Sequence, residues 1–236
     1  MLAKNTATAL MTQGRIQLQG AIAAFTCAAC FIIGAVTLKW IAPDIYVFPE
    51  GRLRVIEQYG VLLHVWHFII FPLVGLSVLF LNRTLVKQTT RPLGGFSTLC
   101  TLVAYVALCH DIAMFTIETL SNELFLQQHF ESHQQLTQQT MTIYSVLIKL
   151  RASTEWGIDV WLCLMNVYLL FQRRFHPILQ ILGIAVGVLG VLVLFNSSFH
   201  YLEFTYLSGM IIWFLSVGAW LAIANPPPTH SDTQGT

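Results

Sequence analysis

Charged residues are scarce in this chain: Asp, Glu, Lys and Arg together make up only 10% of its 236 residues. Soluble domains carry about 25% of these residues, so the shortage excludes an ordinary soluble domain. Basic and acidic residues nearly balance, with a net charge of +1, and no basic excess favours nucleic acid as a partner. The partner that this composition indicates is the lipid bilayer.

The polar loops lack cysteine, because all five cysteines fall inside apolar segments, so cysteine usage says little about the redox compartment. Cys27 and Cys30 have the CxxC spacing, which places both thiols on one face of a helix. Packing of small residues inside a membrane helix is the interpretation we favour, with a redox pair as the alternative.

Apolar residues make up 56% of the chain, and they gather in runs of about 20 residues separated by polar segments. Pro72 is expected to kink the second run. The sequence predicts an all-α fold, a polytopic membrane bundle of six transmembrane helices within residues 20–224. The six predicted helices cover residues 20–41, 59–81, 95–118, 152–171, 178–195 and 204–224.

The predicted loops carry a weak charge bias, with seven basic residues on one side of the membrane and five on the other. This bias predicts that both termini are cytoplasmic, and we expect the protein in a bacterial inner membrane. Residues 1–19 then form a cytoplasmic lead and residues 225–236 a flexible cytoplasmic tail. The larger group is Lys4, Arg15, Arg83, Lys87, Arg91, Arg173 and Arg174, and the smaller is Lys39, Arg52, Arg54, Lys149 and Arg151.

Two connections on the predicted outer side are long, whereas the cytoplasmic loops are short. They are residues 42–58 and residues 121–151, and the second has a broken helical pattern of apolar residues. This second connection either extends the third and fourth helices beyond the membrane or lies on the membrane surface as an amphipathic segment.

Ionisable residues occur within the apolar runs. His110 and Asp111 lie side by side in the third run, although a central Asp costs about 2.5–3.5 kcal/mol on the membrane-insertion scale. At about 1.5 Å per residue, His67 in the second run and Asp159 in the fourth lie at a similar depth. The full set predicted for a polar network or ligand-binding pocket is His64, His67, His110, Asp111, Glu118, Glu155, Asp159 and Asn166.

Four roles are open for these residues, and the one we favour is a structural network that fixes the register of the helices. A transition metal is another, with His67, His110 and Asp159 as candidate ligands, since imidazole and carboxylate groups suit such metals. His129 and His133 form an HxxxH pair and are further candidate metal ligands. A b-type haem held by His67 and His110, and a proton or substrate path, are the remaining roles.

The fifth apolar run carries a face of small residues, Gly183, Gly187 and Gly190. Small residues at this spacing let two helices approach closely. The pattern predicts close helix packing that serves either the fold itself or the contact with a partner subunit or a second copy of the chain.

Residues 168–187 read YLLFQRRFHPILQILGIAVG. The end of one predicted helix is followed by the basic turn Arg173-Arg174, then by Phe175-His176-Pro177, then by a span that contains Leu-Gly. This arrangement resembles a broad family of bacterial multi-helix membrane proteins of unknown function. The resemblance implies a membrane bundle and brings no site with it.

These observations favour a non-enzymatic multi-pass membrane protein, an accessory or small-molecule-binding protein with a His/Asp/Glu pocket on its outer side and no predicted catalytic residue. The alternative is a metal- or haem-dependent membrane oxidoreductase with its site in the outer half of the bundle. A further alternative is a small-solute or proton-coupled transporter, which is less favoured because the sequence shows no inverted repeat.

Overall fold

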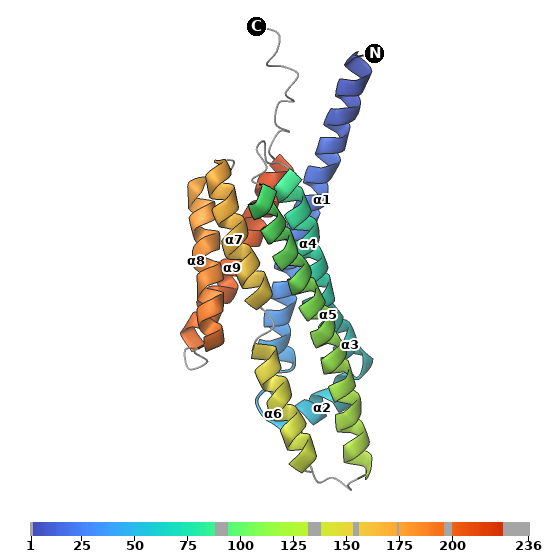
Figure 1. Ribbon diagram of the computed structural model, residues 1–236. Helices are drawn as coiled ribbons and strands as arrows, with labels where there is room; N and C mark the ends of the chain where they lie inside the picture. Colours follow the sequence, from blue (N-terminus) through green and yellow to red (C-terminus); the bar gives the residue numbers. More distant parts are fainter. Residues whose placement is uncertain are drawn as a thin grey trace.

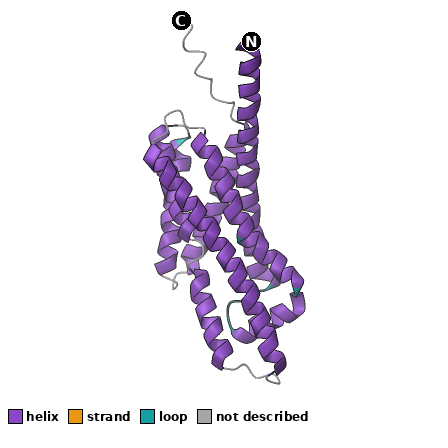
Figure 2. Cartoon of the chain, turned by 45° about the vertical axis from the view of Figure 1, so that its right-hand side comes forward, coloured by secondary structure: helices purple, strands orange, loops and turns teal. Residues whose placement is uncertain are grey.

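The computed structural model describes residues 2–87, 94–131, 138–152, 156–173, 175–195 and 200–223. Every regular element in these ranges is a helix (Figure 2), which confirms the predicted all-α fold. The elements are α1 (Leu2–Val36), the π-helical turn η1 (Thr37–Ile41), α2 (Pro49–Tyr59), α3 (Val61–Ile70), α4 (Pro72–Lys87), α5 (Gly94–Glu131), α6 (Gln138–Ala152), α7 (Trp156–Gln172), α8 (Pro177–Phe195) and α9 (His200–Ile223).

Four segments of the described chain are long and apolar enough to cross a membrane: Gly14–Ile41, Val61–Lys87, Gly94–Gln127 and Leu202–Ile223. The helix α7 is apolar but has only 17 residues, which gives it a length of roughly 26 Å against about 30 Å of hydrocarbon. The structure therefore supports a multi-pass membrane protein, whereas the predicted count of six crossings is not confirmed.

The helices α1, α4, α5, α7, α8 and α9 run side by side as a bundle (Figure 1), and α1 packs between α4 and α9 while α7 packs between α5 and α8. The start of α1 and the end of α9 lie at the same end of the bundle. Trp161 and Trp213 are the largest fully buried side chains of its core and meet edge-on, with ring centroids 6.1 Å apart. Cys27 and Cys30 are also buried in this core, and the Cys27 thiol donates to the Val74 carbonyl, in keeping with a packing role.

The second predicted span is broken at Pro72. The helix α3 ends at Ile70 and α4 begins at Pro72, with Phe71 between them at φ −115° and ψ −86°. Proline lacks the N–H that continues a helix, and its ring clashes with the preceding turn. The kink that the sequence predicts is therefore confirmed.

A separate lobe lies at the end of the bundle opposite to the start of α1 (Figure 1), and it comprises η1, α2, the first half of α3, residues 115–131 of α5, and α6. It forms because α5 has 38 residues, a length of about 57 Å that far exceeds the hydrocarbon thickness. The helix α6 packs against this extended end of α5 (Figure 1). The lobe has its own hydrophobic core, formed by Ala42, Ile45, Val55, Ile56, Leu63, Trp66, Phe125 and Tyr144.

Candidate functional site

A buried arginine occupies the place where the lobe meets the bundle. Pro49 is the first residue of α2, a position that suits its fixed φ, and one turn later Arg52 points into the protein with no exposed surface. Its Nη2 donates to Oε2 of Glu118 at 2.6 Å and to Oδ1 of Asn122 at 2.5 Å. Glu118 and Asn122 are four residues apart on α5, so both face α2.

Two more side chains complete this group. The hydroxyl of Tyr46, in the turn before α2, donates to Oε1 of Glu118 at 3.0 Å. The same hydroxyl lies 3.4 Å from Nε2 of His67, and that nitrogen lies 3.7 Å from Oε2 of Glu118. We call Tyr46, Arg52, His67, Glu118 and Asn122 the junction cluster.

In the junction cluster the charges of Arg52 and Glu118 compensate each other, but some hydrogen-bond donors have no partner among the described residues. Removing two ions from water costs several kcal/mol for each ion, and this cost is offset only when further hydrogen bonds satisfy both groups. The carboxylate of Glu118 accepts bonds on both oxygens. Arg52 also has the rings of Tyr46 and Phe125 5.8 and 5.6 Å from its guanidinium carbon, an arrangement that favours a cation.

Several buried donors of this region have no hydrogen-bond partner among the residues that the structure describes. They are Nε and Nη1 of Arg52, Nδ2 of Asn122 and Nε1 of Trp66. The indole of Trp66 belongs to the same region, since its ring centroid lies 4.9 Å from that of His67 and 6.5 Å from that of Tyr46. Four N–H donors in and around the junction cluster therefore have no acceptor among the described residues.

The sequence-predicted residues fall into separate groups. His67 and Glu118 meet in the junction cluster, and His64 lies half-buried one turn earlier on α3. Asp111 lies deeper on α5, where a Cβ placed at Gly75 of α4 would be 2.5 Å from its Oδ2. His110, its neighbour in the sequence, is half-buried.

The predicted residues of the fourth span belong to a different part of the bundle. Asp159 accepts a hydrogen bond of 2.8 Å from the hydroxyl of Tyr206 in α9. Asn166 accepts one of 3.1 Å from Nε1 of Trp213, also in α9, and donates to the carbonyl of Leu162. This face of α7 therefore meets α9, and the structure does not place Asp159 beside His67.

The predicted metal site finds no support in this geometry. Among the described residues, no three His, Cys, Asp or Glu side chains are placed so that they could hold a metal ion. His67 turns toward Glu118, and Asp159 turns toward Tyr206, so these two candidate ligands have different neighbours. Glu155, His133 and the side chain of His129 lie outside the described residues.

The three glycines of α8 lie against α7 of the same chain. A Cβ on Gly183 would collide with the amide of Asn166, one on Gly187 with the thiol of Cys163, and one on Gly190 with the carboxyl of Asp159. Of the two uses that the sequence left open for this face, close packing within the chain is the one that these contacts show. A partner subunit there stays a prediction.

The sequence analysis did not predict three residues of the junction cluster: Tyr46, Arg52 and Asn122. Arg52 was overlooked because the sequence predicts that it belongs to an outer loop. One signal does mark Arg52: it is three and four positions from Val55 and Ile56, on the buried stripe of α2, whereas Arg54 is exposed. An arginine on the apolar stripe of a short helix indicates a buried partner of opposite charge.

No protein-family model, no curated protein and no solved structure matches this chain. The resemblance of residues 168–187 to a bacterial membrane family therefore stays a prediction. Function has to be argued from the residues and their geometry.

Proposed function

We propose that this chain is a multi-pass membrane protein that acts by binding a small molecule rather than by catalysis, and that the junction cluster is its binding site. The observation that carries the proposal is the fully buried guanidinium of Arg52, whose Nε and Nη1 have no partner among the described residues. A buried donor left without a partner costs about 1–3 kcal/mol. A ligand that accepts these hydrogen bonds would recover that cost.

The charge of the cluster favours an uncharged ligand. The cation of Arg52 is already paired with the carboxylate of Glu118, so a charged ligand would bring an unbalanced charge into a buried place. Nε and Nη1 of Arg52 are N–H donors without a partner among the described residues, and they call for acceptor oxygens such as those of a carbonyl. The rings of Tyr46, Trp66 and Phe125 would contact an apolar or planar body.

The place of the cluster along α5 suits such a ligand. Glu118 lies 24 residues after Gly94, the first residue of α5, or about 36 Å along the helix. The hydrocarbon layer is about 30 Å thick, so the cluster lies near the boundary between lipid and water. A small molecule with both apolar and acceptor groups concentrates at that boundary.

The other functions receive less support. A purely structural network would be expected to satisfy its buried donors, and this one leaves three donor nitrogens, on Arg52 and Asn122, without partners among the described residues. A metal-dependent oxidoreductase needs a set of ligands that the described residues do not assemble. A transporter would use the buried carboxylates Asp111 and Asp159, which lie against different helices, α4 and α8.

The test compares two matched substitutions on α2. Arg52→Lys keeps the cation that pairs with Glu118 but removes Nε and the second donor arm. Arg54→Lys makes the same change two residues away at an exposed position. The wild type and both variants are purified in mild detergent, checked for a cooperative melt, and extracted for small-molecule mass spectrometry.

We expect one small molecule to accompany the wild type and Arg54→Lys in near-equal amounts to the protein, and to be lost from Arg52→Lys. Absence of any such molecule from the wild type would overturn the proposal. Equal retention by Arg52→Lys and Arg54→Lys would overturn the assignment of the site to the junction cluster.

A further inference from the structure

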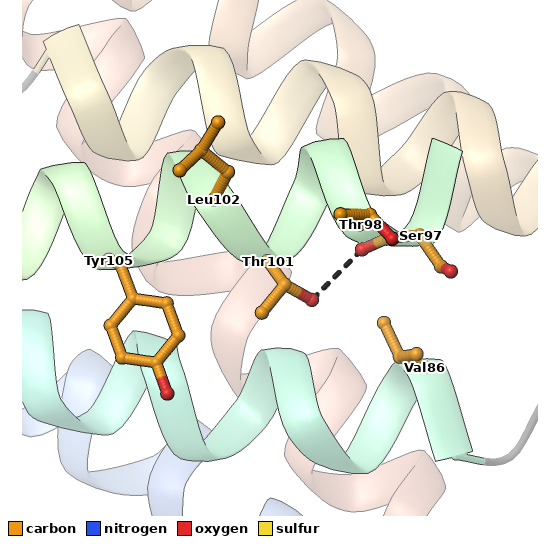
Figure 3. Close-up of a pocket in the computed structure, with 6 residues that line it drawn as sticks. All are labelled: Val86, Ser97, Thr98, Thr101, Leu102 and Tyr105. Carbon is orange, nitrogen blue, oxygen red and sulfur yellow. Dashed lines mark hydrogen bonds between the residues drawn. The ribbon is translucent and has the colours of Figure 1, made fainter. Parts of the chain in front are cut away.

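A shallow groove lies between α4 and α5 at the opposite end of the bundle from the lobe. It has a volume of about 330 Å³, and Figure 3 shows the residues that line it, with the ring of Tyr105 on the side of α5 that faces α4. Both helices belong to segments long enough to cross a membrane, so in a bilayer the groove would face lipid. Its lining residues are Val86, Ser97, Thr98, Thr101, Leu102 and Tyr105.

The surface of this groove suits a hydrocarbon chain. The hydroxyls of Ser97 and Thr98 donate to the carbonyl of Gly94, and that of Thr101 donates to the carbonyl of Ser97 (Figure 3, dashed line). Their hydrogens are therefore already used within α5. The remaining lining, mainly Leu102 and the ring of Tyr105, which points toward α4, is apolar.

The length of the groove matches one leaflet of a bilayer. Eight residues separate Ser97 from Tyr105 on α5, a distance of about 12 Å along the helix axis. Half of the hydrocarbon layer is about 15 Å thick. One acyl chain of a lipid in the leaflet near the termini would therefore lie along the groove.

Two exposed cations lie in the last two turns of α4, near Val86 of the groove. Arg83 is three residues before Val86 and therefore lies on a neighbouring part of the surface of α4, and Lys87 is one helical turn after Arg83. Neither forms an ion pair within the part of the chain that the structure describes. The nearby first turn of α5 contains no acidic residue, and its amides form the positive end of the helix dipole.

We propose that this groove binds one anionic phospholipid, with an acyl chain along Leu102 and Tyr105 and the phosphate beside Arg83 and Lys87. The apolar lining explains why the ligand comes from the bilayer, and the two exposed cations explain why its headgroup is anionic. Both sites use α5, but this groove lies at its first turns and the junction cluster about 20 Å or more farther along the helix, so the groove does not depend on the ligand proposed there.

The test uses the full chain in detergent and native mass spectrometry, with dioleoyl phosphatidylglycerol and dioleoyl phosphatidylcholine as the two probes. Lys87→Gln removes a cation at the groove, and Arg15→Gln removes an exposed cation at the same end but on α1. Leu102→Trp enlarges a side chain that lines the groove, and Leu99→Trp places the same ring on the exposed surface of α5 outside it.

We expect the wild type to retain one phosphatidylglycerol in preference to phosphatidylcholine, and Lys87→Gln to lower its occupancy about fivefold. Leu102→Trp should lower the occupancy of both lipids, while Arg15→Gln and Leu99→Trp leave them unchanged. Equal retention of the two lipids by the wild type would overturn the proposal. So would equal losses within either matched pair of variants, since binding would then not occur at this groove.

Discussion

Arg52 and Glu118 form a fully buried ion pair of 2.6 Å between residues that are 66 positions apart in the sequence. The pair joins α2 to α5 at the place where the lobe meets the bundle. Asn122 and Tyr46 add hydrogen bonds to the arginine and the carboxylate, respectively. Each charge depends on the other, because neither reaches water.

Glu118→Gln tests this dependence, because it keeps the size of the side chain and removes its charge. Arg52 would then be a buried cation without a counter-ion, and breaking a buried pair in this way costs about 3–5 kcal/mol. We expect the melting temperature in detergent to fall by many degrees. The control is Asp44→Asn, which removes the partner of the exposed Arg54 and should cost at most about 1 kcal/mol.

A double variant separates the charge from the shape of the site. Replacing Arg52 by Met together with Glu118 by Leu removes both ions, and such replacements are often neutral or stabilising by about 1–4 kcal/mol. The double variant should therefore melt well above Glu118→Gln. If the two variants have the same melting temperature, the loss of stability in Glu118→Gln comes from packing and not from the unpaired cation.

Gly190→Ala tests the packing of α8 on α7. An added methyl group would take the place of the Asp159 carboxyl, so the helices must separate or the carboxyl must turn away. Overpacking of this kind costs about 1–3 kcal/mol. Gly14→Ala is the matched control, since nothing lies within 4 Å of its added Cβ, and in a helix it should stabilise by about 0.5–1 kcal/mol. Equal melting temperatures for the two variants would contradict this packing.

Tyr206→Phe tests the hydrogen bond between α9 and the carboxyl of Asp159. The substitution keeps the ring and removes the hydroxyl that donates at 2.8 Å, so a buried acceptor loses a partner. We expect a loss of about 1–3 kcal/mol in a thermal or chemical melt. Tyr105→Phe removes a hydroxyl from an exposed tyrosine and should leave stability unchanged, whereas equal effects would show that the Tyr206 bond contributes nothing.

The sequence predicted correctly those features that depend on interactions within one segment of the chain. Apolar runs predicted helices, and Pro72 predicted the break between α3 and α4, because proline acts on the turn that contains it. The glycines of α8 predicted close packing for the same kind of local reason. The predicted count of six crossings was less secure, because hydropathy does not fix where a short helix such as α7 begins.

What the sequence did not reveal depends on contacts between distant segments. Hydropathy follows only the apolar part of α5, so its polar extension to Glu131, and with it the lobe, was left as one of two alternatives. Depth along a helix put Asp159 level with His67, but depth does not say which neighbour a side chain faces. Asp159 turns toward α8 and α9 because Gly190 leaves room there. Arg52 was missed because its partner is on another helix.

The orientation of the chain can be tested with the lysines it already has. Lys39 and Lys149 are exposed on the lobe, and Lys87 is exposed at the opposite end of the bundle. If the positive-inside rule holds here, the lobe faces outward and the end with Lys87 faces the cytoplasm. A membrane-impermeant amine reagent applied to intact bacterial spheroplasts should then modify Lys39 and Lys149, and modify Lys87 only after permeabilisation. Modification of Lys87 alone in intact spheroplasts would show the inverted orientation, with the junction cluster at the cytoplasmic side and the lipid groove in the outer leaflet.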